Sequence, residues 1–317
     1  MHALLDAIST LEPPVQACRI FHGRGGRFAG CEQWTLDAYP PVLVLTSFAP
    51  ATDDELATID AALRARWQQA AAGQPLNWVF QQRGEALRIE GRSDTRLMAG
   101  EVPEPHVVME DGALLRVQLQ RGQNHGLFLD MAEGRRWVRA HVAAHRARTG
   151  QGARVLNLFA YTCAFSVAAL QAGAAEVVNV DMSRGAMATG QHNHQLNGLL
   201  AGARFLAHDI FSSWGKITRS GPYDLVIVDP PSYQKGSFVA TKDYARLMRR
   251  LPDLLAPGGH ALLCLNAPEL GVDFLRAQMH EQAPGLAFVE RVANPAVFAD
   301  IDEDRSLKVL VFRDTPP

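Results

Sequence analysis

The sequence predicts an α/β fold in which a Rossmann-like, mostly parallel sheet follows a smaller N-terminal α+β domain. Beyond residue 150, short continuous apolar runs alternate with amphipathic segments of helical spacing. Parallel strands covered by helices on both faces have this pattern. Before residue 120, turn signals separate most of the apolar runs, as in hairpins. We therefore expect an N-terminal domain at residues 1–120 and the parallel-sheet domain at residues 121–317.

Composition excludes several classes of protein. The 317 residues suggest about two domains at ~100–200 residues each. Hydrophobic residues make up 47% and charged residues 20%, so general disorder is excluded. The net charge of −2 offers no bulk attraction for a polyanion. Apolar runs are far shorter than the ~20 residues of a membrane span. Four scattered cysteines, without a C-x-x-C pair or a secretion signal, indicate a cytoplasmic protein and no metal site.

The N-terminal region predicts one long helix among strands. Residues 52–69 begin with acidic and continue with basic side chains, which suits the helix dipole. Leu56, Ile59, Leu63 and Trp67 recur there at helical spacing. Strands are expected at residues 42–48, 76–80, 86–90, 107–110 and 113–118. Asp111-Gly112 is a two-residue hairpin turn between the last two.

The C-terminal region predicts alternating strands and helices. Strands are expected at residues 154–158, 176–180, 203–206, 223–228, 260–265, 287–292 and 307–313. Helices are expected at residues 136–148, 164–172, 185–196, 242–255 and 272–282. No clear helix separates the final two strands, so they are expected to form an antiparallel pair at one edge of the sheet.

Polar residues follow the carboxyl ends of these strands, where open α/β sheets bind ligands. Three of the first five ends carry an aspartate, namely Asp181, Asp209 and Asp229. Asp181 lies about 20 residues beyond Thr162, a spacing that suits an acceptor for two ribose hydroxyls. The alternative is that Asp181 caps the following helix. The first loop lacks G-x-G-x-x-G, which disfavours NAD or FAD and is compatible with S-adenosylmethionine (AdoMet). The glycine cluster at residues 23–26 lies outside any strand–helix context and is expected to be a loop.

Asp229-Pro230-Pro231 is the sharpest motif. The two prolines remove backbone donors and leave carbonyl oxygens free to accept from a substrate amino group. Asp229 can hold the ammonium of a methionine moiety or a substrate N–H. Tyr233 offers a ring on which a base could stack. The alternative is a turn that only ends the strand.

In order, these motifs resemble those of class I AdoMet-dependent methyltransferases. The upstream run from Gly126 to Asp130, with Glu133 and Arg135-Arg136, resembles the bacterial 23S ribosomal RNA methyltransferases of the Rlm type. Residues 82–88 resemble a strand region of their small domain. The resemblance covers roughly residues 75–317. It is specific for methyl transfer from AdoMet and less specific for RNA.

The resemblance implies AdoMet as cofactor and RNA as substrate. Phe159, Ala160, Tyr161 and Thr162 would wrap the methionine part, Asp181 would hold the ribose, and Asp209 would accept from the adenine amino group beside Ile210. Asp130 and Arg135 would close one side of the site. Asn157, Met182, Ser183, His208 and Asp229 complete the expected cofactor-binding set. The catalytic residues would be Asp229, Pro230, Pro231, Tyr233 and Asn266.

Two positions depart from the family pattern. Cys163 stands where a glycine is usual. Asn266 stands where cytosine-C5 members carry a nucleophilic cysteine, and Cys264, two residues earlier, is expected to be a packed core thiol. An asparagine at this strand end resembles the guanine-modifying members. The sequence therefore favours transfer to a guanine nitrogen of ribosomal RNA.

Two other functions stay open from the sequence. One is methyl transfer to a small molecule or a protein, and the other is AdoMet binding without catalysis. Two groups of basic residues could contact phosphates or simply be solvated faces. The first contains Arg19, His22, Arg24 and Arg27, and the second Arg135, Arg136, Arg139, Arg146 and Arg148.

Overall fold

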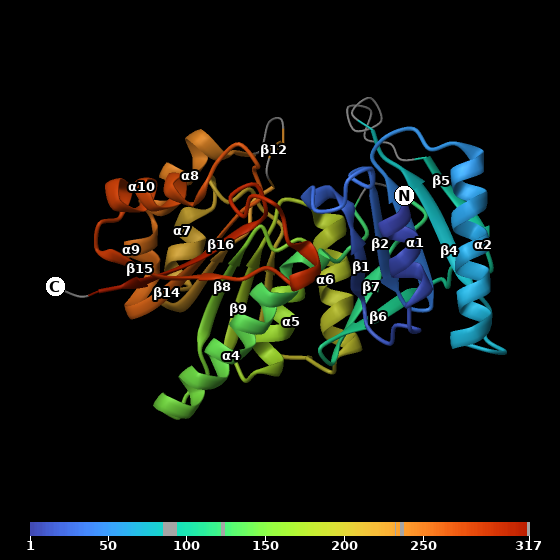
Figure 1. The fold of residues 1–317 in the computed structure, drawn as a ribbon. Coiled ribbons are helices and arrows are strands. Elements are labelled where there is room, and N and C mark those ends of the chain that lie inside the picture. The colour runs from blue at the N-terminus through green and yellow to red at the C-terminus, as the bar shows by residue number, and fades with distance from the viewer. Residues whose placement is uncertain (85–93, 122–123, 232, 235–237, 316–317) are drawn as a thin grey trace. The chain divides into compact units, whose positions relative to one another are not determined.

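The computed structural model describes residues 1–84, 94–121, 124–231, 233–234 and 238–315 (Figure 1). The chain divides into two compact units. Unit 1 contains Met1–Asp130 and Pro295–Asp302, and unit 2 contains Met131–Asn294 and Glu303–Pro317. The chain therefore passes between the units three times. The strand expected at residues 86–90 lies outside the described residues.

Unit 1 is built on a mixed sheet ordered β1-β2-β3-β4-β5, with a separate hairpin of β6 and β7. Its strands are β1 (Cys18–His22), β2 (Trp34–Tyr39), β3 (Val42–Ser47), β4 (Asn77–Gln82), β5 (Asp94–Ala99), β6 (His106–Glu110) and β7 (Ala113–Val117). Its helices are α1 (His2–Ser9) and α2 (Asp53–Ala70), with short 3₁₀ turns η1 (Gly23–Gly25) and η3 (Ala296–Phe298). Another short turn, η2 (Leu129–Met131), lies at the first passage between the units.

The helix and hairpin expected in unit 1 are confirmed. The hydroxyl of Thr52 accepts from the Glu55 N–H (3.2 Å), and the Glu55 carboxylate accepts from the Thr52 N–H (2.9 Å). This capping box fixes the start of α2. Asp111 (φ 47°) and Gly112 (φ 78°) both adopt left-handed backbone, as a type I′ hairpin turn requires. Helix α1 and strands β1, β2 and β5 were not expected from the sequence.

The glycine cluster at residues 23–26 is a tightly packed turn, as expected for a loop. A Cβ atom on Gly23 would lie 1.8 Å from the carbonyl oxygen of Cys31. One on Gly25 would lie 2.3 Å from the carbonyl oxygen of Ala299. The Ile301 N–H donates to the carbonyl of Gly25 (2.9 Å). These glycines therefore serve close backbone packing against the returning segment 295–302.

Unit 2 contains a seven-stranded sheet ordered β10-β9-β8-β11-β14-β16-β15. The strands are β8 (Arg154–Leu158), β9 (Glu176–Val180), β10 (Ala203–Leu206), β11 (Tyr223–Val228), β14 (Leu255–Leu265), β15 (Leu286–Val292) and β16 (Lys308–Asp314). β8 to β11 and β14 pair in parallel, whereas β16 pairs antiparallel with both β14 and β15. The expected antiparallel pair is therefore confirmed, and it joins the sheet through β16.

Helices cover both faces of this sheet (Figure 1). They are α4 (Ala132–Thr149), α5 (Ala164–Gln171), α6 (Arg184–Leu196), α7 (Trp214–Arg219), α8 (Ala240–Met248), α9 (Leu251–Leu254) and α10 (Val272–Gln282). Alternate residues of each strand face opposite sides. Along β11, Val226 and Val228 pack in the apolar cluster with α7 to α10, whereas Leu225 and Ile227 pack in the cluster with α4 and α5.

The single helix expected at residues 242–255 is wrong in extent. Helix α8 ends at Met248 and the short α9 begins at Leu251, followed by Pro252. A proline lacks the N–H that would continue the first helix, so it is tolerated only at the start of a new one. Strand β14 then begins at Leu255, five residues earlier than expected. Helix α7 and the short strands β12 (Tyr233–Gln234) and β13 (Phe238–Val239) were also missed.

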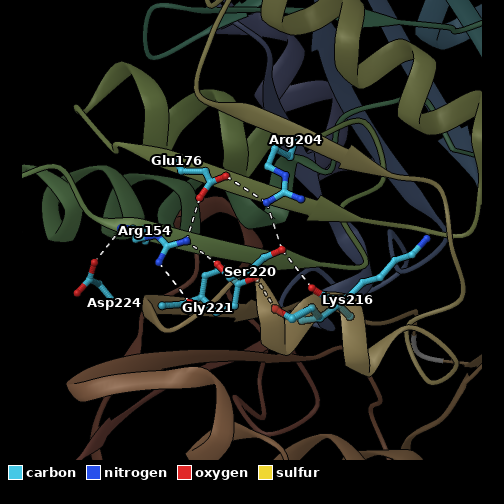
Figure 2. A network of polar contacts seen from close by, with 9 residues as sticks. Arg154, Glu176, Arg204, Lys216, Ser220, Gly221 and Asp224 are labelled. Atoms are coloured by element: carbon cyan, nitrogen blue, oxygen red, sulfur yellow. Dashed lines mark hydrogen bonds and ion pairs between the residues drawn. The ribbon is translucent and has the colours of Figure 1, made fainter.

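A polar network ties the amino ends of β8, β9 and β10 to the end of α7 (Figure 2). The Arg154 guanidinium donates to Glu176 (3.1 Å) and to the carbonyls of Ser220 (2.5 Å) and Gly221 (3.4 Å). Arg204 reaches the same Glu176 carboxylate at 3.5 Å. A cation at helix carbonyls complements the helix dipole. This end of the sheet is thus braced, and the opposite, carboxyl end carries the loops.

Candidate active site

The sheet order changes direction between β8 and β11. From β8 the chain moves outward through β9 and β10, and from β11 it moves outward on the other side through β14. The loops after β8 and β11 therefore diverge at this point, which is where open α/β sheets form a ligand crevice. The residues expected after β8, β9, β10, β11 and β14 all lie at this one edge of the sheet.

The loop after β8 has a strained backbone and no glycine. Phe159 (φ 57°), Tyr161 (φ 47°) and Cys163 (φ 63°) all adopt the left-handed conformation. The Ala160 N–H donates to the carbonyl of Val180 (3.1 Å) and holds the loop against β9. Such strain persists only where the surroundings over-determine it, and it is frequent at ligand sites.

Asp181 is fixed at the end of β9 by two backbone donors. Its Oδ2 accepts from the Tyr161 N–H (2.9 Å) and its Oδ1 from the Ser183 N–H (2.8 Å). Ser183, rather than Asp181, is the N-cap of α6, because its hydroxyl accepts from the Ala186 N–H (3.2 Å). Each carboxylate oxygen keeps a further lone pair. The geometry of Asp181 therefore fits the two hydroxyls of a ribose.

The three site residues expected after β10 differ in their exposure to solvent. His208 and Asp209 are exposed, whereas Ile210 is buried in the core. Asp209 Oδ1 accepts from the Ser212 N–H (2.8 Å), so one oxygen already orders the turn. Met182, after β9, exposes 54% of its surface. An exposed thioether and a partly free carboxylate suit the apolar face and the amino group of an adenine.

Asp229 is half-buried at the end of β11, and Pro230 behind it is buried. Burial raises the pKa of the Tyr244 hydroxyl well above its ordinary value, and the nearby charges of Cys264 and Asp229 raise it further. The Tyr244 hydroxyl donates to the carbonyl of Cys264. Tyr233 belongs to β12, and its side chain, like Ser232, lies outside the described residues.

A row of aromatic rings that was not predicted from the sequence links the two central loops. The rings of Phe159 and Phe238 lie 5.4 Å apart, and those of Phe238 and Tyr244 lie 5.3 Å apart, all edge to face. Phe238 is buried in β13, after the proline motif. Because Phe159 belongs to the loop after β8, this packing fixes the two loops relative to each other.

Asn266 is exposed at the end of β14, and Ala267 after it is buried. The ammonium of the fully buried Lys308 donates to the carbonyls of Ala267 (2.7 Å) and Asp304 (2.7 Å). Lys308 is the first residue of β16 and stands between Leu307 and Val309, which signals a buried cation in the sequence but does not reveal its partners. Cys264 is only 1% exposed, which confirms the expected core thiol.

A buried chain of side-chain hydrogen bonds runs beneath the site. The Asn157 amide donates to Asn179 Oδ1 (2.9 Å), and the Asn179 amide donates to the Ser166 hydroxyl (3.0 Å). His194 Nε2 lies 2.8 Å from that hydroxyl, and His194 Nδ1 lies 2.7 Å from the carbonyl of Gly190. A carbonyl only accepts, so Nδ1 carries the proton and Nε2 accepts from Ser166. Burial lowers the pKa of His194, in keeping with a neutral ring.

The remaining expected residues lie in different units. Asp130 belongs to unit 1, in the turn η2, and Arg135 belongs to unit 2, where it is 5% exposed beside the Phe165 ring. Of the two basic groups proposed for phosphate contact, some members are engaged within the protein and others, such as Arg27, Arg146 and Arg148, are exposed. Arg19 pairs with Asp37 at 2.7 Å, and Arg24 stacks on a phenylalanine ring.

The described residues contain no group of three or more His, Cys, Asp or Glu side chains placed to hold a metal ion. None of the helices in the described part of the chain is long and apolar enough to cross a membrane.

Comparison with known proteins gives consistent matches. The ribosomal RNA large subunit methyltransferase I of Aeromonas salmonicida is 31% identical over 233 residues, covering 71% of this chain and 55% of that protein. The ribosomal RNA large subunit methyltransferase K/L of a Psychrobacter species is 35% identical over 202 residues, covering 61% of this chain and 23% of that protein. The chain thus spans about half, or less, of the length of these relatives.

A solved structure matches almost the whole chain. SMU.776, which is assigned as a methyltransferase and was crystallised with S-adenosylhomocysteine, superposes with a TM-score of 0.77 at 25% identity. The match covers 98% of this chain and 78% of that one. The model of the S-adenosylmethionine-dependent methyltransferase family matches residues 18–313. With the strand order and the loops described above, this match shows that the chain belongs to the S-adenosylmethionine-dependent methyltransferases.

Proposed function

We propose that this chain methylates a base nitrogen in RNA, specifically a guanine of ribosomal RNA. The observation that carries the proposal is the pairing of Asp229-Pro230-Pro231 with an exposed Asn266 at one edge of the sheet. Methylation of a pyrimidine carbon needs an attacking thiolate, because that carbon is otherwise a poor nucleophile. Cys264 is buried in the core and Asn266 cannot supply a thiolate, so a nitrogen acceptor fits this site better.

The residues at the edge of the sheet divide into cofactor and acceptor roles. Asp181 would hold the ribose, Asp209 the adenine amino group, and the loop from Phe159 to Thr162 the methionine part. Bound AdoMet supplies an electrophilic methyl group on its sulfonium. Asp130 and Arg135 are proposed to close one side of the cofactor site, and Asn157 to support its floor through Asn179.

The acceptor roles follow from donor and acceptor chemistry. Asp229 and the carbonyl oxygens of Pro230 and Pro231 would accept from the amino group of the base and aim its lone pair at the methyl group. Asn266 would hold another edge of the base through its amide, and Tyr233 would stack on it. No covalent intermediate is needed, so orientation and exclusion of water supply most of the rate.

The names of the relatives favour RNA over other acceptors. Both relatives described above are named for methylation of large-subunit ribosomal RNA. A ribosomal substrate would place the reaction in the bacterial cytoplasm. A second candidate, a small molecule or protein acceptor, is favoured by the net charge of −2. Salt dependence separates the two, since RNA affinity falls steeply with salt and small-molecule turnover does not.

Tritiated AdoMet and total RNA from a strain that lacks this gene provide the test. We expect label in RNA, and nucleoside analysis to place it on guanine. Asp229→Ala is expected to lose turnover. Label that appears only in protein or in small molecules, or an Asp229→Ala variant with full turnover, would contradict the proposal.

A further inference from the structure

Unit 2 carries an exposed surface that combines cations with aromatic rings. We call it the arginine–aromatic face. It is formed by α7, by α8 and by the residues that flank them. Its members are Phe211, Trp214, Lys216, Arg219, Lys242, Arg246, Arg249 and Arg250.

Two guanidinium groups of this face lie over aromatic rings. The Arg246 Cζ atom lies 4.0 Å from the centre of the Phe211 ring, and the Arg250 Cζ atom lies 5.9 Å from that of Trp214. Both arginine side chains remain about half exposed, at 53% and 48%. The inner side of each guanidinium is therefore packed on a ring while much of the group faces solvent.

The other cations belong to the same surface. Lys242, Arg246 and Arg249 are spaced by four and three residues along α8, so they project from one side of the helix. Arg219 folds back along α7, since a Cβ atom on Gly215 would lie 3.7 Å from its guanidinium. The stacking of Arg250 on Trp214 joins the two helices into one face.

The face begins at the edge of the sheet that carries the candidate active site. Helix α7 follows the carboxyl end of β10, and α8 follows the loop after β11. Phe211 is adjacent to Ile210 in the sequence, and the Lys216 ammonium lies 3.3 Å from His208 Nε2. In Figure 2 the Lys216 side chain extends away from the network at the amino edge. An RNA strand whose target base lies at Asp229 could therefore reach this face by way of Lys216, which contacts His208 after β10.

Positive charge is in excess on this face. The two carboxylates of α8 and α9 each pair with one arginine of the face, Asp243 with Arg246 (2.9 Å) and Asp253 with Arg250 (3.6 Å). This leaves a surplus of positive charge on a chain whose net charge is −2. Phosphates attract such a surplus, and unpaired bases stack on guanidinium planes and aromatic rings.

We infer that the arginine–aromatic face binds the single-stranded RNA that flanks the methylated base. This inference rests on the proposed function, because it takes RNA as the substrate. Phosphates would contact Lys216, Lys242 and Arg249, and a base would stack on the exposed side of Arg246 or Arg250. The basic groups expected from the sequence lie elsewhere, and this face was not among them.

The test compares two charge reversals. The Arg246→Glu/Arg250→Glu double variant removes both stacks, and Arg276→Glu is the matched control. Arg276 also stacks on a ring, that of Phe288 at 4.8 Å, but it lies on α10 and its ring belongs to β15, the edge strand of the sheet, and not to the face. The probe is 23S ribosomal RNA from a strain that lacks this gene. RNA affinity is measured over a range of salt concentrations, together with methyl transfer and S-adenosylhomocysteine affinity.

We expect the double variant to bind the RNA at least tenfold more weakly, with a shallower salt dependence, and to bind S-adenosylhomocysteine as tightly as the natural protein. Arg276→Glu should change RNA affinity less than twofold. If the natural protein methylates the RNA and the double variant binds and methylates it equally well, the inference is overturned and the proposed function stands. If the natural protein labels protein instead of RNA, both are overturned.

Discussion

The thiol of Cys163 occupies the space that a side chain on Gly190 would need. A Cβ atom on Gly190 would lie 2.5 Å from Cys163 Sγ and 3.1 Å from its Cβ. Cys163 precedes α5 with φ 63°, and Gly190 lies within α6. Burial raises the pKa of this thiol, which keeps it protonated and unreactive. The cysteine at position 163, where the family usually has glycine, therefore requires a glycine at position 190.

Gly190→Ala is expected to destabilise the protein by about 1–3 kcal/mol, because the added methyl group overlaps the buried thiol. In a Cys163→Gly background the same change should be neutral or stabilising, since the space is free and alanine is the better helix former by about 1 kcal/mol. Urea unfolding of the four variants in a double-mutant cycle measures the coupling. Additive effects within a few tenths of a kcal/mol would show that the two residues do not compete.

Sequence patterns predicted those strands that are buried because their own residues are apolar. The bounds of β8, β9, β10 and β11 were predicted to the residue, because each is a short apolar run between turn residues. The same logic failed for β2. Asp37 in the middle of β2 is only 4% exposed, because Arg19 from β1 holds its carboxylate at 2.7 and 3.0 Å. A buried aspartate of this kind depends on a partner distant in sequence, which periodicity does not reveal.

The candidate site divides in the same way. Aspartates at strand ends could be placed from the chain order alone, since parallel strands end at one edge. Phe238 and Lys308 could not, because each acts through a contact with another part of the chain. The arginine–aromatic face was also missed. Its cations come from separate segments that only the packing of α7 against α9 and α8 brings together.

Asp181→Asn should weaken S-adenosylhomocysteine binding about 10–100-fold, the range for a lost hydrogen bond to a charged group. The amide nitrogen would face one of the two backbone donors, at Tyr161 or Ser183, and would lose one acceptor for the ribose. Isothermal titration calorimetry measures this loss. Asp273→Asn at the exposed start of α10 is the control and should leave affinity unchanged. Equal affinity of the two variants would remove Asp181 from the cofactor site.

Lys308→Met should lower the free energy of unfolding by about 1–3 kcal/mol. The apolar side chain fills a similar volume but removes the donor from both carbonyls. The contact at Ala267 is buried, so that acceptor is left unsatisfied and carries such a cost, whereas the contact at Asp304 is only partly buried. Because Ala267 follows Asn266, we also expect turnover to fall more than S-adenosylhomocysteine affinity. Chemical denaturation and methyl-transfer assays test both. Lys242→Met, at an exposed position, is the control for stability.

The stability of unit 2 should fall as the pH drops below about 6.5. Burial, together with the neighbouring His260, His145 and Arg148, lowers the pKa of His141 to about 4. The folded state therefore holds His141 neutral, whereas the unfolded chain protonates near its ordinary value. Above pH 6.5 both states hold His141 neutral, and the free energy of unfolding is unaffected. As the pH falls toward 4, the unfolded chain takes up a proton that the folded state does not, and the free energy of unfolding decreases. The expected loss in the free energy of unfolding is about 1–2 kcal/mol at pH 5.

His141→Phe provides the decisive comparison. Phenylalanine keeps a ring in the stack on Trp137, whose centre lies 4.7 Å from that of His141, but it cannot take up a proton. Thermal unfolding between pH 7.5 and 5 should show a smaller loss of stability in this variant than in the natural protein. His280→Phe, at an exposed position on α10, should keep the full pH dependence. If His141→Phe loses stability in parallel with the natural protein, the acid sensitivity arises from other groups.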